Sequence, residues 1–225
     1  MVLRAGVDDA PGRDALEKLC RAYWLPLYVY VRRRGYSTHD AEDLTQGFFA
    51  DLLSRGVVAR ADPMRGRFRT FLLSALINYL RNAHDHRHAA RRGGTMERIS
   101  IDEAVARDAL AQVESESLAP DRAFDRSWAL ALLDRAFQRL KSEQERADKG
   151  AWFARVRPLL LARAEPGAYD AIAAEFGLTK NAVAVAVHRL GVRYRELVRA
   201  EIADTVSSIE ELQDEQNDLL HLLAS

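Results

Sequence analysis

Apolar side chains recur at intervals of three and four residues along most of the chain, and this helical period constrains the fold more than any other feature. The clearest run has its apolar positions at Phe68, Phe71, Leu72, Ala75, Leu76, Tyr79, Leu80 and Ala83. No segment shows a convincing alternation of polar and apolar residues, which a half-buried β-strand would need. The sequence therefore predicts an all-α protein.

Two more helices are expected before this run, over residues 14–34 and 37–56. Pro26 lies inside the first and is expected to kink or divide it, because proline lacks the backbone N–H that a helix interior uses. Ser37 and Asp40, at the start of the second, have the spacing of a capping box. Three helices with this much apolar surface can bury one compact core.

The 33 basic and 33 acidic residues cancel to a net charge of zero, which by itself argues against nucleic acid, because nucleic-acid-binding domains usually carry a basic surface. The total conceals an uneven distribution. By segment the formal charge is +6 for residues 1–93, −4 for 94–120, +5 for 121–200 and −7 for 201–225. Alternating blocks of this kind often mark a polyanionic partner.

The charge blocks and the turn residues at their borders predict two small helical domains with a linker and a tail. The divisions are a helical domain at residues 1–94, an acidic linker at 95–120, a second helical domain at 121–200 and an acidic amphipathic tail at 201–225. Two alternatives are open for the tail. It folds over a basic face of the second domain and competes with DNA, or it completes that domain's core.

The chain has no run approaching about 18 uncharged apolar residues and no hydrophobic signal segment, so we expect no membrane partner. The single cysteine, Cys20, excludes an intramolecular disulfide. Hydrophobic residues make up 48% of the chain, enough for a core. We expect a soluble, cytoplasmic protein.

The segment AYDAIAAEFGLTKNAVAVAVHRLG, residues 168–191, has the spacing of a helix-turn-helix. Gly177 suits the left-handed turn, Thr179 can cap the next helix, and the small Ala173 lets the two helices approach closely. The alternative is an ordinary helical hairpin. Because turn, cap and small residue fall in register together, we favour the DNA-binding motif.

In that motif the second helix would meet DNA with its exposed face. The residues expected there are Lys180, Asn181, Ala184, Val185 and His188, next to the capping Thr179, with Arg189, Arg193 and Arg195 placed to contact phosphate. The opposite, apolar face of this helix is expected to pack against the first helix of the motif, with Val183, Ala186, Val187, Leu190, Tyr194 and Leu197. The small side chain of Ala184 offers little to a base edge, and Gly191 is expected to break or bend the helix. We therefore expect modest affinity, dominated by phosphate contacts.

Two stretches carry a resemblance to a known family. The first is DAEDLTQGFF, residues 40–49, followed by GRFRTFLLSALINYLRN, and the second is YDAIAAEFGLTKNAV, residues 169–183, followed by HRL and YRELV. Over roughly residues 14–200 the chain resembles the extracytoplasmic-function (ECF) type of RNA polymerase sigma factor, in the sigma-70 family. The resemblance implies a region-two-like domain, a linker and a region-four-like domain. It also implies transcription initiation rather than enzymatic activity, with no cofactor.

The resemblance implies that the acidic helix docks on the largest subunit of core RNA polymerase. The matching residues are Asp40, Glu42, Asp43 and Gln46. On the residues alone, the alternative is a solvated helix start whose acids are favoured by the helix dipole.

The same resemblance assigns the next loop and helix to the promoter's minus-ten element, which must be melted. Melting needs cations that hold single-stranded phosphates and polar groups that bind an extruded base. The candidates are the cations Arg65, Arg67, Arg69 and Arg81 and the amides Asn78 and Asn82. The helix-turn-helix would contact the minus-thirty-five element.

Other partners and functions stay open. The family implies an anti-sigma factor or a Ser/Thr kinase as further partners, with Thr38 and Thr45 as phosphorylation candidates. One alternative function is a stand-alone helix-turn-helix regulator. The other, a metal enzyme ligated by His84, His86 and His88, is disfavoured because only the first and last share a helix face and no HExxH glutamate lies between them.

Overall fold

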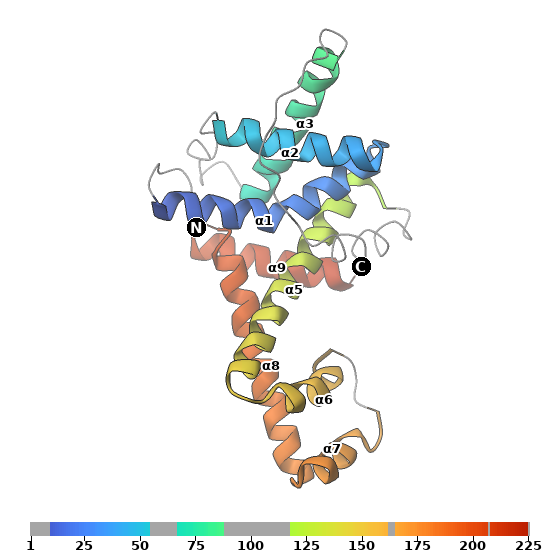
Figure 1. Ribbon diagram of the computed structural model, residues 1–225, viewed down its shortest axis with the longest axis vertical. Helices are drawn as coiled ribbons and strands as arrows, with labels where there is room; N and C mark the ends of the chain where they lie inside the picture. Colours follow the sequence, from blue (N-terminus) through green and yellow to red (C-terminus); the bar gives the residue numbers. More distant parts are fainter. Residues whose placement is uncertain (1–9, 55–66, 88–117, 162–164, 207, 225) are drawn as a thin grey trace. The chain divides into compact units, whose positions relative to one another are not determined.

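The computed structural model describes residues 10–54, 67–87, 118–161, 165–206 and 208–224. Within these stretches the only regular secondary structure is α-helix, as Figure 1 shows. The helices are α1 (Ala10–Arg33), α2 (Thr38–Ser54), α3 (Phe68–Arg87), α5 (Pro120–Arg146), α6 (Gly150–Leu161), α7 (Ala168–Phe176), α8 (Lys180–Ala203) and α9 (Ile209–Ala224). The predicted all-α class is confirmed. None of these described helices is long and apolar enough to cross a lipid bilayer.

The chain divides into two compact units, which we call the first unit (Met1–Ala131 with Ile202–Ser225) and the second unit (Leu132–Glu201). This division differs from the predicted borders in two places. The N-terminal part of α5 belongs to the first unit, and so does the acidic tail with α9. Because the border falls inside the continuous helix α5, no turn or break in the local sequence marks it.

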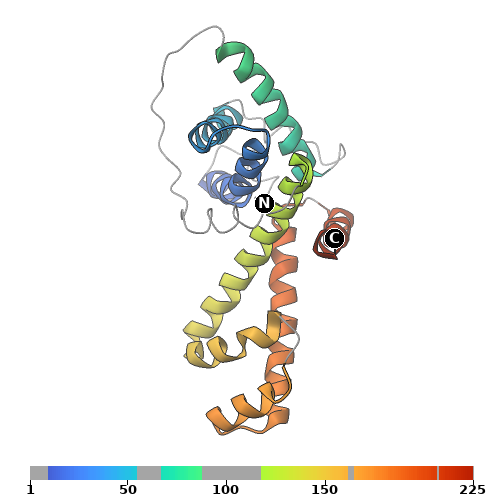
Figure 2. The ribbon, with the colours of Figure 1, turned by 90° about the vertical axis from the view of Figure 1, so that its right-hand side faces the viewer.

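In the first unit, α1 is buried on nearly all sides from Leu19 to Val31, which explains its dense apolar sequence. α2 lies side by side with α1 in both ribbon views (Figure 1 and Figure 2). Ala123 of α5 packs against Val29. Pro26 does not divide α1, because the helix continues through it.

The start of α2 is capped as its sequence predicts. The backbone N–H of Asp40 donates to Oγ of Ser37 at 3.1 Å, and the Ser37 hydroxyl donates to Oδ2 of Asp40 at 2.7 Å. Gly35 makes the preceding turn at a φ of 91°, a conformation that glycine adopts without steric cost. The predicted end of this helix near Gly56 lies outside the described residues.

α2 and α3 approach closely at Gly47. A Cβ atom built on Gly47 would overlap with Oη of Tyr79. The Tyr79 ring cannot easily move aside, because it packs edge-on against Phe48 with the ring centroids 5.8 Å apart. The missing side chain of Gly47 thus provides the space for the tyrosine hydroxyl.

We expect Gly47→Ala to destabilise the protein, because overpacking a close contact costs about 1–3 kcal/mol. This cost outweighs the gain of up to about 1 kcal/mol that alanine brings to a helix interior. In a Tyr79→Phe background, which removes the overlapping oxygen, the same substitution should become neutral or stabilising. Urea unfolding of the wild type, the two single variants and the double variant measures the coupling free energy between Gly47→Ala and Tyr79→Phe as a double-mutant cycle. Equal destabilisation in both backgrounds would contradict this explanation.

The second unit has a core to which α5, α6, α7 and α8 all contribute. The buried residues are Ala136, Phe137, Leu140, Phe153, Val156, Ile172, Ala173, Val183, Val187, Leu190 and Leu197. Four of them, Val183, Val187, Leu190 and Leu197, belong to the apolar stripe predicted for α8. That stripe is confirmed as the face of α8 that joins the core.

The expected break at Gly191 does not occur. α8 runs from Lys180 to Ala203 without interruption. An interior glycine costs about 1 kcal/mol relative to alanine. Burial of Leu190 and Leu197 on either side offsets this cost, because burying one leucine contributes about 1.5–3 kcal/mol.

Candidate nucleic-acid and protein interfaces

The acidic start of α2 presents charged side chains away from the core of the first unit. Leu44 and Phe48 lie on the buried side of the helix, whereas Glu42 and Asp43 are exposed. Asp43 is 59% exposed, and its Oδ2 lies 3.7 Å from Nε2 of His39. An exposed carboxylate with so loose a partner is available to another protein.

The other two residues predicted to bind polymerase are less accessible. Asp40 and Gln46 are half-buried, and Asp40 also serves in the capping of α2 by Ser37. All four residues lie within the first three turns of α2. Glu42 and Asp43 are the members that a partner can reach most easily.

The two candidate phosphorylation sites differ in access. Thr45 is completely buried on the core side of α2, so its hydroxyl is out of reach of a kinase in the folded protein. Thr38 is exposed at the start of the same helix. Only Thr38 remains a candidate.

Three residues predicted to meet the minus-ten element lie on one exposed face of α3. Asn78, Arg81 and Asn82 are spaced by three and four residues, so their side chains share a face, and all three are exposed. Arg81 also lines an open groove of about 610 Å³ with Arg34 and Tyr36. Two guanidinium groups beside an aromatic ring suit a nucleic-acid strand, whereas Asp121, which lines the same groove, opposes one.

Arg69 does not lie on this surface, contrary to its assignment as a DNA contact. It is only 5% exposed, and its guanidinium lies over the ring of Trp128 at 4.3 Å. The cause is its register on α3, because Arg69 precedes the buried Leu72 and Leu76 by three and seven residues and so shares their face. Arg69 is therefore a core residue.

Three carboxylates surround Arg69. Its ion-pair distances are 3.4 Å to Asp125, 3.5 Å to Glu215 and 3.1 Å to Asp218. Burial raises the pKa of Glu215 and of Asp125 above the usual range even though Arg69 lowers both. Burial, followed by the charge of Glu215, also raises the pKa of Tyr23 to about 12. The cause of these shifts is that Arg69, Glu215 and Tyr23 are buried away from water.

Two further arginines, Arg65 and Arg67, were predicted to contact the minus-ten element. Arg67 is 33% exposed and forms an ion pair with Asp218. Arg65 lies outside the described residues. Of the predicted cations, the described structure thus leaves Arg81 exposed, Arg67 half-buried and Arg69 buried.

In the second unit, α7 and α8 are joined by a tight turn. Gly177 has φ 63° and ψ 31°, the left-handed conformation, and its N–H donates to the carbonyl of Ala173. The backbone N–H of Ala182 donates to Oγ1 of Thr179 at 3.1 Å, which caps α8. The predicted turn and cap are confirmed. Because the Thr179 hydroxyl already accepts this bond, part of its capacity for DNA is used.

The polar residues predicted for the exposed face of α8 are mostly accessible. Exposed residues are Lys180, Asn181, His188, Arg189 and Arg193, and Ala184 is half-buried rather than fully outward. Two of the cations are already paired. Lys180 Nζ lies 2.8 Å from Asp170, and Arg193 lies 2.7 Å from Glu143 and 2.9 Å from Glu196.

These ion pairs reduce the capacity of Lys180 and Arg193 to bind DNA phosphate. Hydrogen bonding to Arg193 lowers the pKa of Glu143, and the same contact raises the pKa of Arg193. To bind phosphate, Lys180 and Arg193 must exchange an internal carboxylate for it. Asn181 and Arg189 are exposed, and no ion pair with another described residue holds Arg189.

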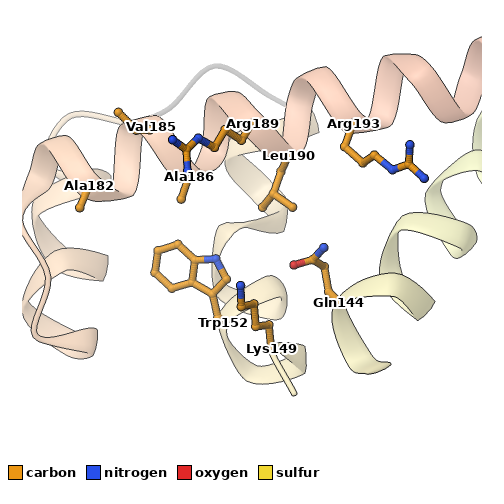
Figure 3. A pocket seen from close by; sticks show the side chains of 9 residues that line it. All are labelled: Gln144, Lys149, Trp152, Ala182, Val185, Ala186, Arg189, Leu190 and Arg193. Atoms are coloured by element: carbon orange, nitrogen blue, oxygen red, sulfur yellow. The ribbon is translucent and has the colours of Figure 1, made fainter. Parts of the chain in front are cut away.

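An open groove of about 540 Å³ runs beside α8 (Figure 3). Ala182, Val185 and Ala186 of α8 line it, and in Figure 3 Ala182 and Ala186 lie on the side of α8 that faces Trp152 of α6. Trp152 is fixed by an edge-on contact with Phe176, with the ring centroids 5.0 Å apart. Ala186, expected on the core side of α8, is half-buried and lines this groove, as does the core residue Leu190.

Sequence reasoning missed the opposite side of the groove. Gln144, Lys149 and Trp152 line it together with Arg189 and Arg193 of α8. Lys149 belongs to a polar stretch that looks in the sequence like a mere separator between two helices. Only the folding of α5 and α6 against α8 brings these residues together, so no local pattern could have revealed them.

No family model, curated protein or solved structure matches this chain.

The described part of the chain contains no candidate metal site. No group of three or more His, Cys, Asp or Glu side chains there is placed to hold an ion. The side chains of His84 and His86, and His88 entirely, lie outside the described residues. Cys20 is buried in α1.

Proposed function

We propose that this protein is a transcription initiation factor that binds core RNA polymerase and directs it to promoters. The first unit would recognise and melt the minus-ten element, and the second would contact the minus-thirty-five element. In this proposal Glu42 and Asp43 face the polymerase, Asn78, Arg81 and Asn82 face the melted strand, and α8 meets duplex DNA.

One observation carries the proposal: a single chain pairs an accessible acidic helix face with an exposed arginine on each of two other helices. Glu42 and Asp43 are exposed on α2, Arg81 with its two asparagines on α3, and Arg189 on α8. The compact left-handed turn at Gly177, followed by a capped helix, supports duplex contact by α8.

A stand-alone DNA-binding regulator is the second candidate, favoured by α7 and α8 taken alone. The pairing of Lys180 with Asp170 and of Arg193 with Glu143 speaks for weak binding by the isolated protein. An initiation factor needs only weak contacts at each element, because the polymerase holds both units on one promoter.

A transcription assay with purified core RNA polymerase distinguishes the initiation factor from the stand-alone regulator. Core enzyme with and without the protein is given fragments of the organism's DNA, and the 5′ ends of the transcripts are sequenced. We expect new start sites, preceded by two short shared elements at a fixed spacing, only when the protein is present. The isolated protein should bind the same fragments weakly.

Two results would reject the initiation role. One is an unchanged set of start sites after the protein is added to core enzyme. The other is tight, sequence-specific duplex binding by the protein alone without any effect on initiation, which would establish the stand-alone regulator.

A further inference from the structure

The face of α9 that packs on the first unit carries acids as well as apolar residues. Leu212, Glu215 and Leu219 are buried there, and Asp218 beside them is 33% exposed. A carboxylate at such a position requires a cation nearby, because burying an unpaired charge is costly. The cations come from the start of α3, far away in sequence.

Arg67 and Arg69 differ in how many carboxylates they contact. Arg69 contacts Asp125 and Glu215 as well as Asp218. The ion pair that Arg67 forms within the described part of the chain is with Asp218. If Asp218 moved away, Arg69 would keep two ion pairs, whereas Arg67 would lose its ion pair and keep only the longer-range attraction of Asp125 and Glu215.

The two arginines also differ in access to solvent. Arg69 is buried with its guanidinium against the ring of Trp128, whereas the side chains of Arg67 and Asp218 are each 33% exposed. An ion pair with both members partly in water is only weakly favourable, so another anion can replace its carboxylate. The Arg67–Asp218 pair is therefore the exchangeable part of the cluster, and Arg69 is the fixed part.

We infer that α9 is an internal competitor of nucleic acid: Asp218 occupies Arg67 where a phosphate of a single strand would bind, and the strand must displace it. The inference rests on the proposed function, which assigns Arg67 to the melted strand. Carboxylate and phosphate oxygens both accept hydrogen bonds from a guanidinium, so they compete for the same N–H groups. The tail from residue 201 onward holds seven acids and no base, which further disfavours a polyanion nearby.

This places the competition differently from the sequence-based expectation that the tail covers a basic face of the second domain. The acids that form the described contacts of α9, Glu215 and Asp218, lie on arginines of the first unit. Release of α9 would thus favour binding of single-stranded nucleic acid at Arg67, and not binding of duplex DNA at α8.

The test compares full-length variants for binding to a fluorescein-labelled single-stranded oligodeoxynucleotide, measured by fluorescence anisotropy at fixed salt. Asp218→Asn should bind about three- to fivefold more tightly than the wild type, the range expected for removing one competing surface ion pair. Asp214→Asn is the matched control, because Asp214 is an exposed acid on the same helix. It makes the same charge change and should alter binding by less than about twofold.

A second pair of variants tests the site itself. Arg67→Ala should change the affinity little in the wild-type background, where Asp218 occupies the arginine, and should abolish the gain in the Asp218→Asn background. This comparison stays informative if Asp218→Asn loosens the fold, because the Arg67→Ala result in the wild type does not depend on it.

Several outcomes would overturn the inference. Equal gains from Asp218→Asn and Asp214→Asn would show a general charge effect. A large loss from Arg67→Ala in the wild type would show that the arginine is already available. If no variant binds the single strand while the wild type still drives promoter-specific transcription with core polymerase, only the competition between Asp218 and nucleic acid is rejected. If that transcription is absent too, the proposed function is rejected as well.

Discussion

Replacing Arg69 with alanine is expected to lower the free energy of unfolding by about 3–5 kcal/mol. Arg69 is the cation shared by Asp125, Glu215 and Asp218, and Glu215 is only 3% exposed. Truncation leaves that carboxylate buried without its cation and removes the guanidinium that lies over Trp128. Urea unfolding followed by far-ultraviolet circular dichroism measures the loss.

Arg122→Ala is the matched control, because Arg122 is an exposed arginine of α5 in the same unit. It should change the stability by no more than about 0.5 kcal/mol. If Arg69→Ala had an equally small effect, the guanidinium would have to lie at the surface, and the buried cluster would be refuted.

The loss caused by Arg69→Ala should also grow as the pH rises. Burial holds the pKa of Glu215 above its usual value, and Arg69 opposes that shift, so removing Arg69 raises the pKa further. The folded protein then retains a proton that the unfolded chain has released. Stability therefore falls as the pH rises from the usual glutamate pKa through the raised folded pKa. Measurements at about pH 5 and about pH 8 should show the larger deficit at the higher pH.

Charge reversal at Asp43 is expected to reduce promoter-specific transcription by about tenfold or more. The side chain is exposed on α2, so Asp43→Lys should leave the stability within about 0.5 kcal/mol of the wild type. If α2 docks on a basic surface of core polymerase, the lysine places like charges opposite each other, which costs several kcal/mol. The transcript yield with purified core enzyme, and co-elution of the variant with that enzyme, measure the effect.

Asp214→Lys provides the control for this experiment. It makes the same change of charge at an exposed position of α9, away from the acidic face of α2. We expect transcription to be retained. A similar loss from both substitutions would point to a general charge effect, and full activity of Asp43→Lys would reject docking through α2.

Much of the local structure could be predicted from short segments of sequence. The apolar stripe of α3, the cap formed by Ser37 and the left-handed turn at Gly177 each depend on residues within about two helical turns. The core stripe of α8 was predictable for the same reason. The exposed positions of Asp43 and Arg81 also follow from which side of the helix carries the apolar residues.

Two of the errors concern positions where a distant segment takes part. Arg69 was assigned to DNA by its charge and its place in a basic loop, but Asp125 and Glu215 arrive from α5 and α9 and allow it to be buried. Gly191 was expected to interrupt α8, but packing of its neighbours on either side holds the helix together. The register of Arg69 with Leu72 and Leu76 is visible in the flanking sequence, but the carboxylates that allow its burial are not.

The sequence by itself determined the helical class, the position of the caps and turn, and which face of each helix is apolar, because hydrogen bonding and side-chain periodicity act over a few residues. The tertiary structure alone decided that α9 belongs to the first unit, that Arg69 is a core residue while Arg67 stays partly accessible, and that Trp152 and Lys149 face α8 across a groove. The physical reason is that burial and ion pairing depend on which segments meet in space. The charge of an arginine shows that it needs an anion, and only the fold shows whether that anion is a carboxylate of the same chain.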